Sequence, residues 1–99
     1  MTVEYRIVWS AKALADIGDI ARFLQRKSST AAERAVATIT VAADTLRIFP
    51  ESGRPYSRAP DRYRELVVPF GREGFVILYR VMPNHVRLFG VKHQREAGY

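Results

Sequence analysis

The stretch from Arg64 to Arg95 most constrains the fold, because it holds three runs rich in β-branched and aromatic residues. Two short segments, Gly71–Gly74 and Met82–His85, separate the runs and have the composition of turns. Strand-like runs joined by such short turns pair as antiparallel neighbours. The sequence therefore predicts three adjacent antiparallel strands in the C-terminal third of the chain.

The central run, Gly74–Val81, is apolar on both of its faces. Side chains alternate across a strand, so residues two apart share a face. The faces carry Ile77, Tyr79 and Val81 on one side and Val76, Leu78 and Arg80 on the other. A strand that is apolar on both sides is expected to be covered on both sides.

The N-terminal half predicts one strand followed by two helices. Apolar residues alternate over Val3–Trp9, Ser10 can cap a helix, and residues 11–27 carry an apolar stripe at helical spacing. Thr30–Glu33 has the form of a capping box, which predicts that a second helix begins there. Pro50 is expected to stop that helix.

Residues 51–60 are rich in Pro, Gly and Ser and carry Arg54 and Arg58, so we interpret them as an exposed basic loop. The predicted element order is β-α-α-β-β-β. This is an α+β arrangement in which a helical hairpin packs on one face of a curved, mainly antiparallel sheet. Residues 1–99 are expected to form a single domain.

Composition restricts the class of protein. With 47% hydrophobic and 26% charged residues, the chain is typical of a soluble globular protein. No apolar run approaches the roughly 18 residues of a membrane span, and the first residues lack the layout of a signal peptide, so we expect a cytoplasmic protein that binds no membrane. With no Cys and two His, we expect no metal site and no cofactor.

The net charge is +6, and the excess leans towards the C-terminal half. Residues 51–99 hold nine Lys and Arg against five acids, whereas residues 1–50 hold seven against five. A basic balance of this size favours an anionic partner such as nucleic acid, a ribonucleoprotein or an acidic protein. A solvated basic surface without a specific partner is the alternative.

Five short segments in the right order resemble the RelE/ParE superfamily of bacterial toxins. They are the first strand and helix start at Tyr5–Ala13, the Pro50 to Gly53 link, and the strand motifs Arg64–Val68, Gly74–Val81 and Val86–Arg95. The resemblance covers nearly the whole chain. It implies the fold predicted above and a toxin of a type II toxin-antitoxin system, held inactive by a cognate ParD-like or RelB-like antitoxin in a hetero-oligomer.

The two branches of the superfamily imply different targets. The RelE branch resembles a ribosome-dependent endoribonuclease that cuts mRNA, and the candidates for that chemistry are Arg72, His93, Arg95 and Tyr99. This chain departs from that pattern, because Pro69, Phe70 and Gly71 stand where such nucleases keep an arginine. The ending Val91–Arg95 looks more like the ParE branch, whose members poison DNA gyrase without catalytic residues of their own. We therefore favour a ParE-like toxin.

The resemblance also suggests contact residues. The candidates for binding the target, gyrase or alternatively the ribosome, are Arg54, Arg58, Arg64, Arg80, Lys92, His93 and Arg95. The candidates for binding the antitoxin are Leu14, Ile17, Val76 and Leu78. A structural role is the alternative for three of these residues: an ion pair with Glu65 or Glu73 for Arg64 and Arg80, and a hydrogen-bonded surface position for His93.

Overall fold

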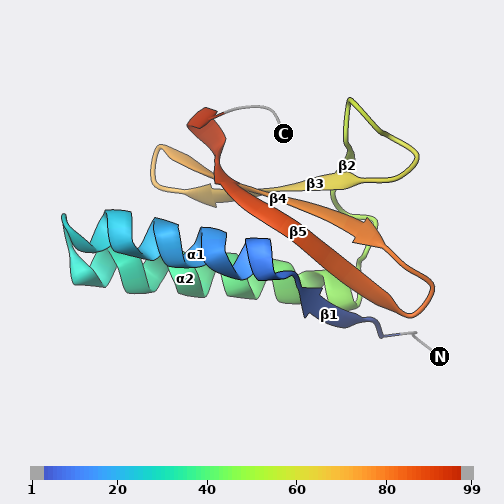
Figure 1. Ribbon diagram of the computed structural model, residues 1–99, viewed down its shortest axis with the longest axis horizontal. Coiled ribbons are helices and arrows are strands. Elements are labelled where there is room, and N and C mark those ends of the chain that lie inside the picture. The colour runs from blue at the N-terminus through green and yellow to red at the C-terminus, as the bar shows by residue number, and fades with distance from the viewer. Residues whose placement is uncertain (1–3, 97–99) are drawn as a thin grey trace.

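The computed structural model describes residues 4–96, which form two helices stacked against one sheet (Figure 1). The two helices and five strands are joined by two 3₁₀ turns. In chain order the elements are β1 (Arg6–Trp9), α1 (Ala11–Gln25), α2 (Ser29–Asp44), η1 (Thr45–Arg47), β2 (Arg54–Pro55), β3 (Arg64–Phe70), β4 (Glu73–Val81), β5 (His85–His93) and η2 (Gln94–Glu96).

The sheet has the strand order β1-β5-β4-β3-β2. The three C-terminal strands are antiparallel neighbours, as the sequence predicts, and β1 joins the edge of β5 in parallel. The predicted α+β fold is confirmed. The structure adds one element, the two-residue strand β2, which pairs with the start of β3 from within the predicted exposed loop.

Both helices cover the same face of the sheet, where the core lies (Figure 1). Ile39 of α2 and Leu46 of η1 are fully buried against Phe75, Ile77 and Tyr79 of β4. These large apolar side chains supply the main stabilisation of the packing, because each fully buried side chain contributes about 1.5–3 kcal/mol. We call the opposite face, which the helices leave uncovered, the outer face.

A β-bulge interrupts the pairing of β4 with β5. Leu78 pairs with Gly90 and Tyr79 pairs with Leu88, so Phe89 is an extra residue on β5. The carbonyl of Phe89 accepts a hydrogen bond of 3.2 Å from the Ser10 hydroxyl. Alternation with the buried Val86 and Leu88 places Phe89 on the same face as Arg87, and the extra residue shifts the alternation for the rest of β5.

The helix caps test the sequence-based boundaries directly. Ser10 caps α1, and its hydroxyl accepts from the N–H of Ala13 at 3.0 Å, as predicted. The predicted capping box at Thr30 is wrong. The cap of α2 is Ser28, whose hydroxyl accepts from the N–H of Ala31 at 3.1 Å, so α2 begins before Thr30. Two candidate hydroxyls stood close together, and the extended backbone of Ser28 decided between them.

Other boundaries also differ. The second helix ends at Asp44 and continues as η1, several residues before Pro50, so Pro50 does not stop it. The first helix ends at Gln25, slightly earlier than predicted. The first strand is paired over Arg6–Trp9, and Val3 lies outside the described residues. At the other end of the chain, His93 is the last residue of β5. Within residues 4–96, no helix has the length and apolar character to cross a bilayer.

The cap assignment predicts that Ser28→Ala destabilises the fold by about 1 kcal/mol, because one N–H of the first turn loses its acceptor. Thr30→Ala is the matched control. It removes a hydroxyl two residues away that caps nothing, and we expect little change or a small gain. Urea unfolding of the two variants measures both effects. An equal loss in both variants would contradict the assignment.

Candidate functional site

The basic segment after η1 is held by a buried tyrosine. Tyr79 is fully buried in β4, and its hydroxyl donates to the carbonyl of Pro50 at 2.8 Å. The same oxygen accepts from the N–H of Gly53 at 2.9 Å. One side chain of the sheet therefore fixes both ends of the turn that leads to Arg54.

Arg64 is the second anchor of this turn. Its guanidinium donates to the carbonyls of Gly53, at 2.7 Å, and Glu51, at 3.3 Å. The closeness of Tyr79 explains why position 53 is a glycine, because a Cβ there would lie 2.5 Å from the Tyr79 hydroxyl. Arg64 thus reaches backbone carbonyls rather than the predicted carboxylates, and much of its donor capacity is used inside the fold.

The environment of Tyr79 shifts its acidity. Burial raises the pKa of the Tyr79 phenol above its ordinary value of 10.0, because the anionic form is poorly solvated. The hydrogen bond from Gly53 and the nearby charge of Arg64 lower this pKa, but the effect of burial is larger.

The outer face of the sheet carries arginines without carboxylate partners. Arg80 of β4 and Arg87 of β5 are directly opposite each other in the ladder, and within residues 4–96 neither forms an ion pair. Like charges opposite each other across a ladder are destabilising. This cost to the fold is a physical indication that the positive charge serves an external ligand.

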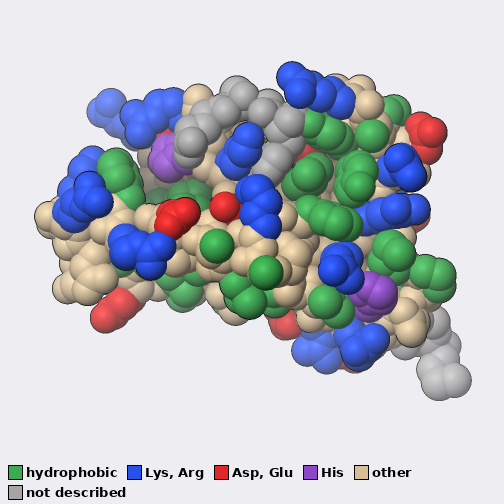
Figure 2. Space-filling view, viewed as in Figure 1, with side chains coloured by type: hydrophobic (Ala, Val, Ile, Leu, Met, Phe, Trp, Pro, Cys, Tyr) green, Lys and Arg blue, Asp and Glu red, His purple; other side chains and the backbone are tan. Residues whose placement is uncertain are grey.

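Aromatic rings lie beside these arginines. The ring of Phe89 meets Tyr63 edge-on at 5.3 Å between centroids, and Tyr63 meets Tyr56 at 6.5 Å. The guanidinium of Arg87 lies 5.8 Å from the centroid of Phe89. Figure 2 shows hydrophobic side chains gathered over the sheet half of the molecule, with Lys and Arg between and around them. We call Tyr63, Arg80, Arg87 and Phe89 the basic outer face.

A separate cleft contains the predicted nuclease residues that can be placed. It is lined by α1 residues and the ends of the sheet, namely Asp19, Ile20, Phe23, Leu24, Phe75, His93 and Arg95. His93 Nδ1 and Arg95 Nε both lie 3.3 Å from the same carboxylate oxygen of Glu73. The ring of His93 also packs edge-on against Phe75 at 5.5 Å. Glu73 thus pairs with the guanidinium of Arg95 and contacts the ring of His93, so both side chains are engaged within the fold.

Arg72 is not among the residues that line this cleft. Arg72 is exposed in the two-residue turn between β3 and β4, next to Gly71, whose φ is 61°. Such turns favour glycine because the left-handed conformation is strained for other residues. Tyr99 lies outside the described residues. The structure therefore brings His93 and Arg95 together, and both contact the carboxylate of Glu73.

The remaining target-binding candidates are dispersed. Arg54 pairs with Glu65 at 3.2 Å, and Arg58 lies exposed in the loop between β2 and β3. Lys92 is in register with Val76 on the outer face. The structure therefore places Arg80 and Lys92 on one face and Arg54 at its edge, but His93 and Arg95 belong to the cleft.

The antitoxin-binding candidates differ in exposure. Leu14 is 57% exposed on α1, whereas Ile17 packs against the core. On the outer face Leu78 is half-buried, and Val76 is only 8% exposed. The four residues do not form one continuous apolar surface, and their role stays a prediction.

Sequence reasoning missed Arg87, Tyr63 and Phe89. Arg87 had a usable signal, since it alternates with the apolar residues Val86 and Leu88 and therefore shares a face with the outward side chains of β4. Phe89 had the same signal, since it lies two residues after Arg87 and also alternates with Leu88. Within residues 4–96, no three His, Asp or Glu side chains are grouped to hold a metal ion.

Comparison with known proteins agrees with this architecture. A family model described as the ParE toxin of the type II toxin-antitoxin system, parDE, matches residues 7–98. Toxin RelE3 of Caulobacter vibrioides is 34% identical over 85 residues, which are 86% of this chain and 89% of that toxin. Toxin RelE2 of the same organism is 35% identical over 88 residues, which are 89% of this chain and 93% of that toxin.

A solved structure shares the fold. A chain of the chromosomal ParDE toxin-antitoxin system from P. aeruginosa superposes with a TM-score of 0.75 at 21% sequence identity. The match covers 93% of the chain described here and 98% of the P. aeruginosa chain. The chain described here belongs to the ParE toxin family of type II toxin-antitoxin systems. Membership of that family implies a cognate antitoxin as partner.

The contacts of Tyr79 predict that Tyr79→Phe destabilises the fold by about 1–3 kcal/mol, because the buried N–H of Gly53 and the partly buried carbonyl of Pro50 lose their partner. In the variant, hydrogen exchange at the amide of Gly53 should accelerate more than exchange at the amide of Ile77 in β4. Tyr5→Phe is the control, since no hydrogen bond of its hydroxyl is recorded within the described chain. Unchanged exchange at Gly53 would show that the hydroxyl does not hold the turn.

The raised pKa of Tyr79 predicts a loss of stability at alkaline pH. The unfolded chain releases this proton near pH 10.0, whereas the folded chain retains it to higher pH. The stabilisation is therefore complete below pH 10.0 and declines as the pH rises towards the folded-state pKa. Urea unfolding at increasing pH measures this effect. The difference in unfolding free energy between the wild-type chain and Tyr79→Phe should shrink above pH 10.0. A constant difference would exclude this linkage.

Proposed function

We propose that this protein is a ParE-like toxin that inhibits growth by poisoning DNA gyrase through its basic outer face. The observation that carries this proposal is the contrast between two groups of cations. Within residues 4–96, Arg80 and Arg87 lie opposite each other without an acidic partner, whereas His93 and Arg95 both contact Glu73. Free cations beside aromatic rings suit a binding surface.

Cleavage of RNA makes a stricter demand on geometry. A base, an acid and phosphate-binding cations must converge within hydrogen-bond reach of one reacting group. Of the candidates for this chemistry, His93 and Arg95 both contact the carboxylate of Glu73, and Arg72 is not among the residues that line their cleft. A carboxylate in this position competes with a phosphate for Arg95, which supports an interaction protein rather than an enzyme.

The antitoxin, which we expect to be ParD-like, holds the toxin inactive in a hetero-oligomer. The net charge of +6 favours an acidic antitoxin segment. Because gyrase acts on chromosomal and plasmid DNA, the proposed site of action is the bacterial cytoplasm.

The second candidate is a RelE-like, ribosome-dependent mRNA endoribonuclease. It is favoured by the two Caulobacter relatives named RelE, each about a third identical to this chain. Its candidate residues are Arg72, His93, Arg95 and Tyr99. A chain that lacks Tyr99 and carries His93→Ala should lose toxicity under this hypothesis and keep it under the gyrase hypothesis.

The experiment that tests the function is induction without antitoxin in bacteria, followed by pulses of labelled thymidine and methionine. Poisoned gyrase should stop thymidine incorporation first and produce double-strand breaks. Supercoiling assays with purified gyrase then check direct inhibition. If methionine incorporation fails first while DNA synthesis continues, the nuclease hypothesis replaces the gyrase hypothesis.

The basic outer face is tested in the same assay. Arg80→Glu combined with Arg87→Glu should reduce gyrase inhibition at least about tenfold, because two attractive charges become repulsive. Arg34→Glu is the matched control, since Arg34 is exposed on α2 on the other side of the sheet. Full inhibition by the double variant, with its fold intact, would remove this face from the target interface.

A further inference from the structure

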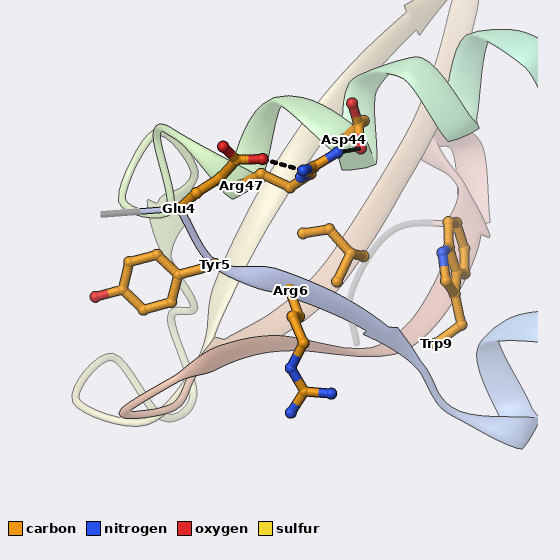
Figure 3. Close-up of a pocket in the computed structure, with 7 residues that line it drawn as sticks. Glu4, Tyr5, Arg6, Trp9, Asp44 and Arg47 are labelled. Atoms are coloured by element: carbon orange, nitrogen blue, oxygen red, sulfur yellow. Dashed lines mark hydrogen bonds and ion pairs between the residues drawn. The ribbon is translucent and has the colours of Figure 1, made fainter. Parts of the chain in front are cut away.

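The edge of the sheet at β1 is open. This strand is outermost in the order β1-β5-β4-β3-β2 and pairs only with β5. A groove runs along its free side, between β1 and the end of α2, and Figure 3 shows Glu4 and Arg47 joined across one end of it. Trp9, also in this lining, comes from the opposite end of the strand (Figure 3).

Backbone hydrogen bonds identify the groups that face the groove. The N–H of Ser10 donates to Leu88 of β5 at 3.0 Å, and the N–H of Tyr5 donates in the opposite direction, to Arg47 of η1 at 2.8 Å. Successive residues of a strand direct their backbone groups to alternate edges. The N–H and C=O groups of Ile7 and Trp9 therefore face the groove, and no backbone partner for them is recorded within residues 4–96.

The side chains beside these groups differ on the two faces of the strand. Ile7 and Trp9 are in register with the buried Val86 and Leu88 and pack against the core. Arg6 points to the outer side, away from Glu4 and Arg47 (Figure 3), and Val8 is in register with Arg87. A strand added here would lie beside Ile7 and Trp9 on one face and beside Arg6 and Val8 on the other, with Arg87 of β5 next to Val8.

We propose that this edge binds an extended segment of the antitoxin in which apolar and acidic residues alternate. Its backbone continues the sheet through Ile7 and Trp9. Its apolar side chains lie beside those two residues under the end of α2, and its acidic side chains lie beside Arg6. The charge of the outer row, with Arg87 one strand further in, selects an acidic segment over a basic one.

The other edge of the sheet is less suited to this role. β2 covers only the start of β3, and the remainder of β3 carries Pro69, which cannot donate to a ladder. Edge strands without such protection are templates for another strand. The inference concerns the antitoxin alone, so it stands or fails separately from the identity of the toxin's target.

The probe is a capped heptapeptide, Val-Glu-Val-Glu-Val-Glu-Val, added to the full chain made by cell-free synthesis. Trp9 is the only tryptophan, so its fluorescence reports binding at this edge. Amide exchange followed by NMR should slow at Ile7 and Trp9 when the peptide is present. Exchange at Val8, whose N–H faces β5, should stay unchanged.

The matched controls reverse the charge. The same peptide with Lys in place of Glu should bind at least about tenfold more weakly. Arg6→Glu should invert this preference, whereas Arg34→Glu on α2 should leave it unaltered.

Three results would each overturn the proposal. One is the absence of any change in Trp9 fluorescence at millimolar peptide, and another is equal binding of the two peptides. The third is protection of Ile7 and Trp9 in the free protein that grows with its concentration, because this would show that a second copy of the chain occupies the edge.

Discussion

The buried hydroxyl of Tyr79 connects the sheet to the chain that leaves the helices. Through Pro50 and Gly53 it fixes the turn that follows η1, and Arg64 completes the attachment from the next strand. A buried phenol with both of its hydrogen-bonding roles satisfied is stabilising, whereas the same group without partners would be costly. The position of β2, and with it the start of the basic loop, follows from this contact.

From that anchored turn the chain returns to β3 in a way that places Tyr63 against Phe89. The bulge at Phe89 is the other requirement, since it adds the residue whose ring Tyr63 meets. The basic outer face therefore depends on two features far apart in sequence, a buried tyrosine and an irregular ladder.

The charges of the molecule are divided among distinct roles. Arg64 and Arg47 stabilise the fold, Arg95 shares Glu73 with His93, and within residues 4–96 the opposed pair Arg80 and Arg87 has no carboxylate partner. Net charge alone treats these arginines as equivalent. Their neighbours decide which of them can bind a target, because a cation already paired with a carboxylate attracts an anion less strongly.

The sequence by itself determined the element order, the antiparallel C-terminal strands and which residues of β4 share a face. These features follow from short-range periodicity and turn composition, and they support the family resemblance. It did not determine which serine capped α2, that two residues of a basic loop form β2, or that Phe89 lies in a bulge. Those outcomes depend on contacts between residues distant in the chain, such as Ser10 with Phe89 and Tyr79 with Pro50, which only the tertiary structure brings together.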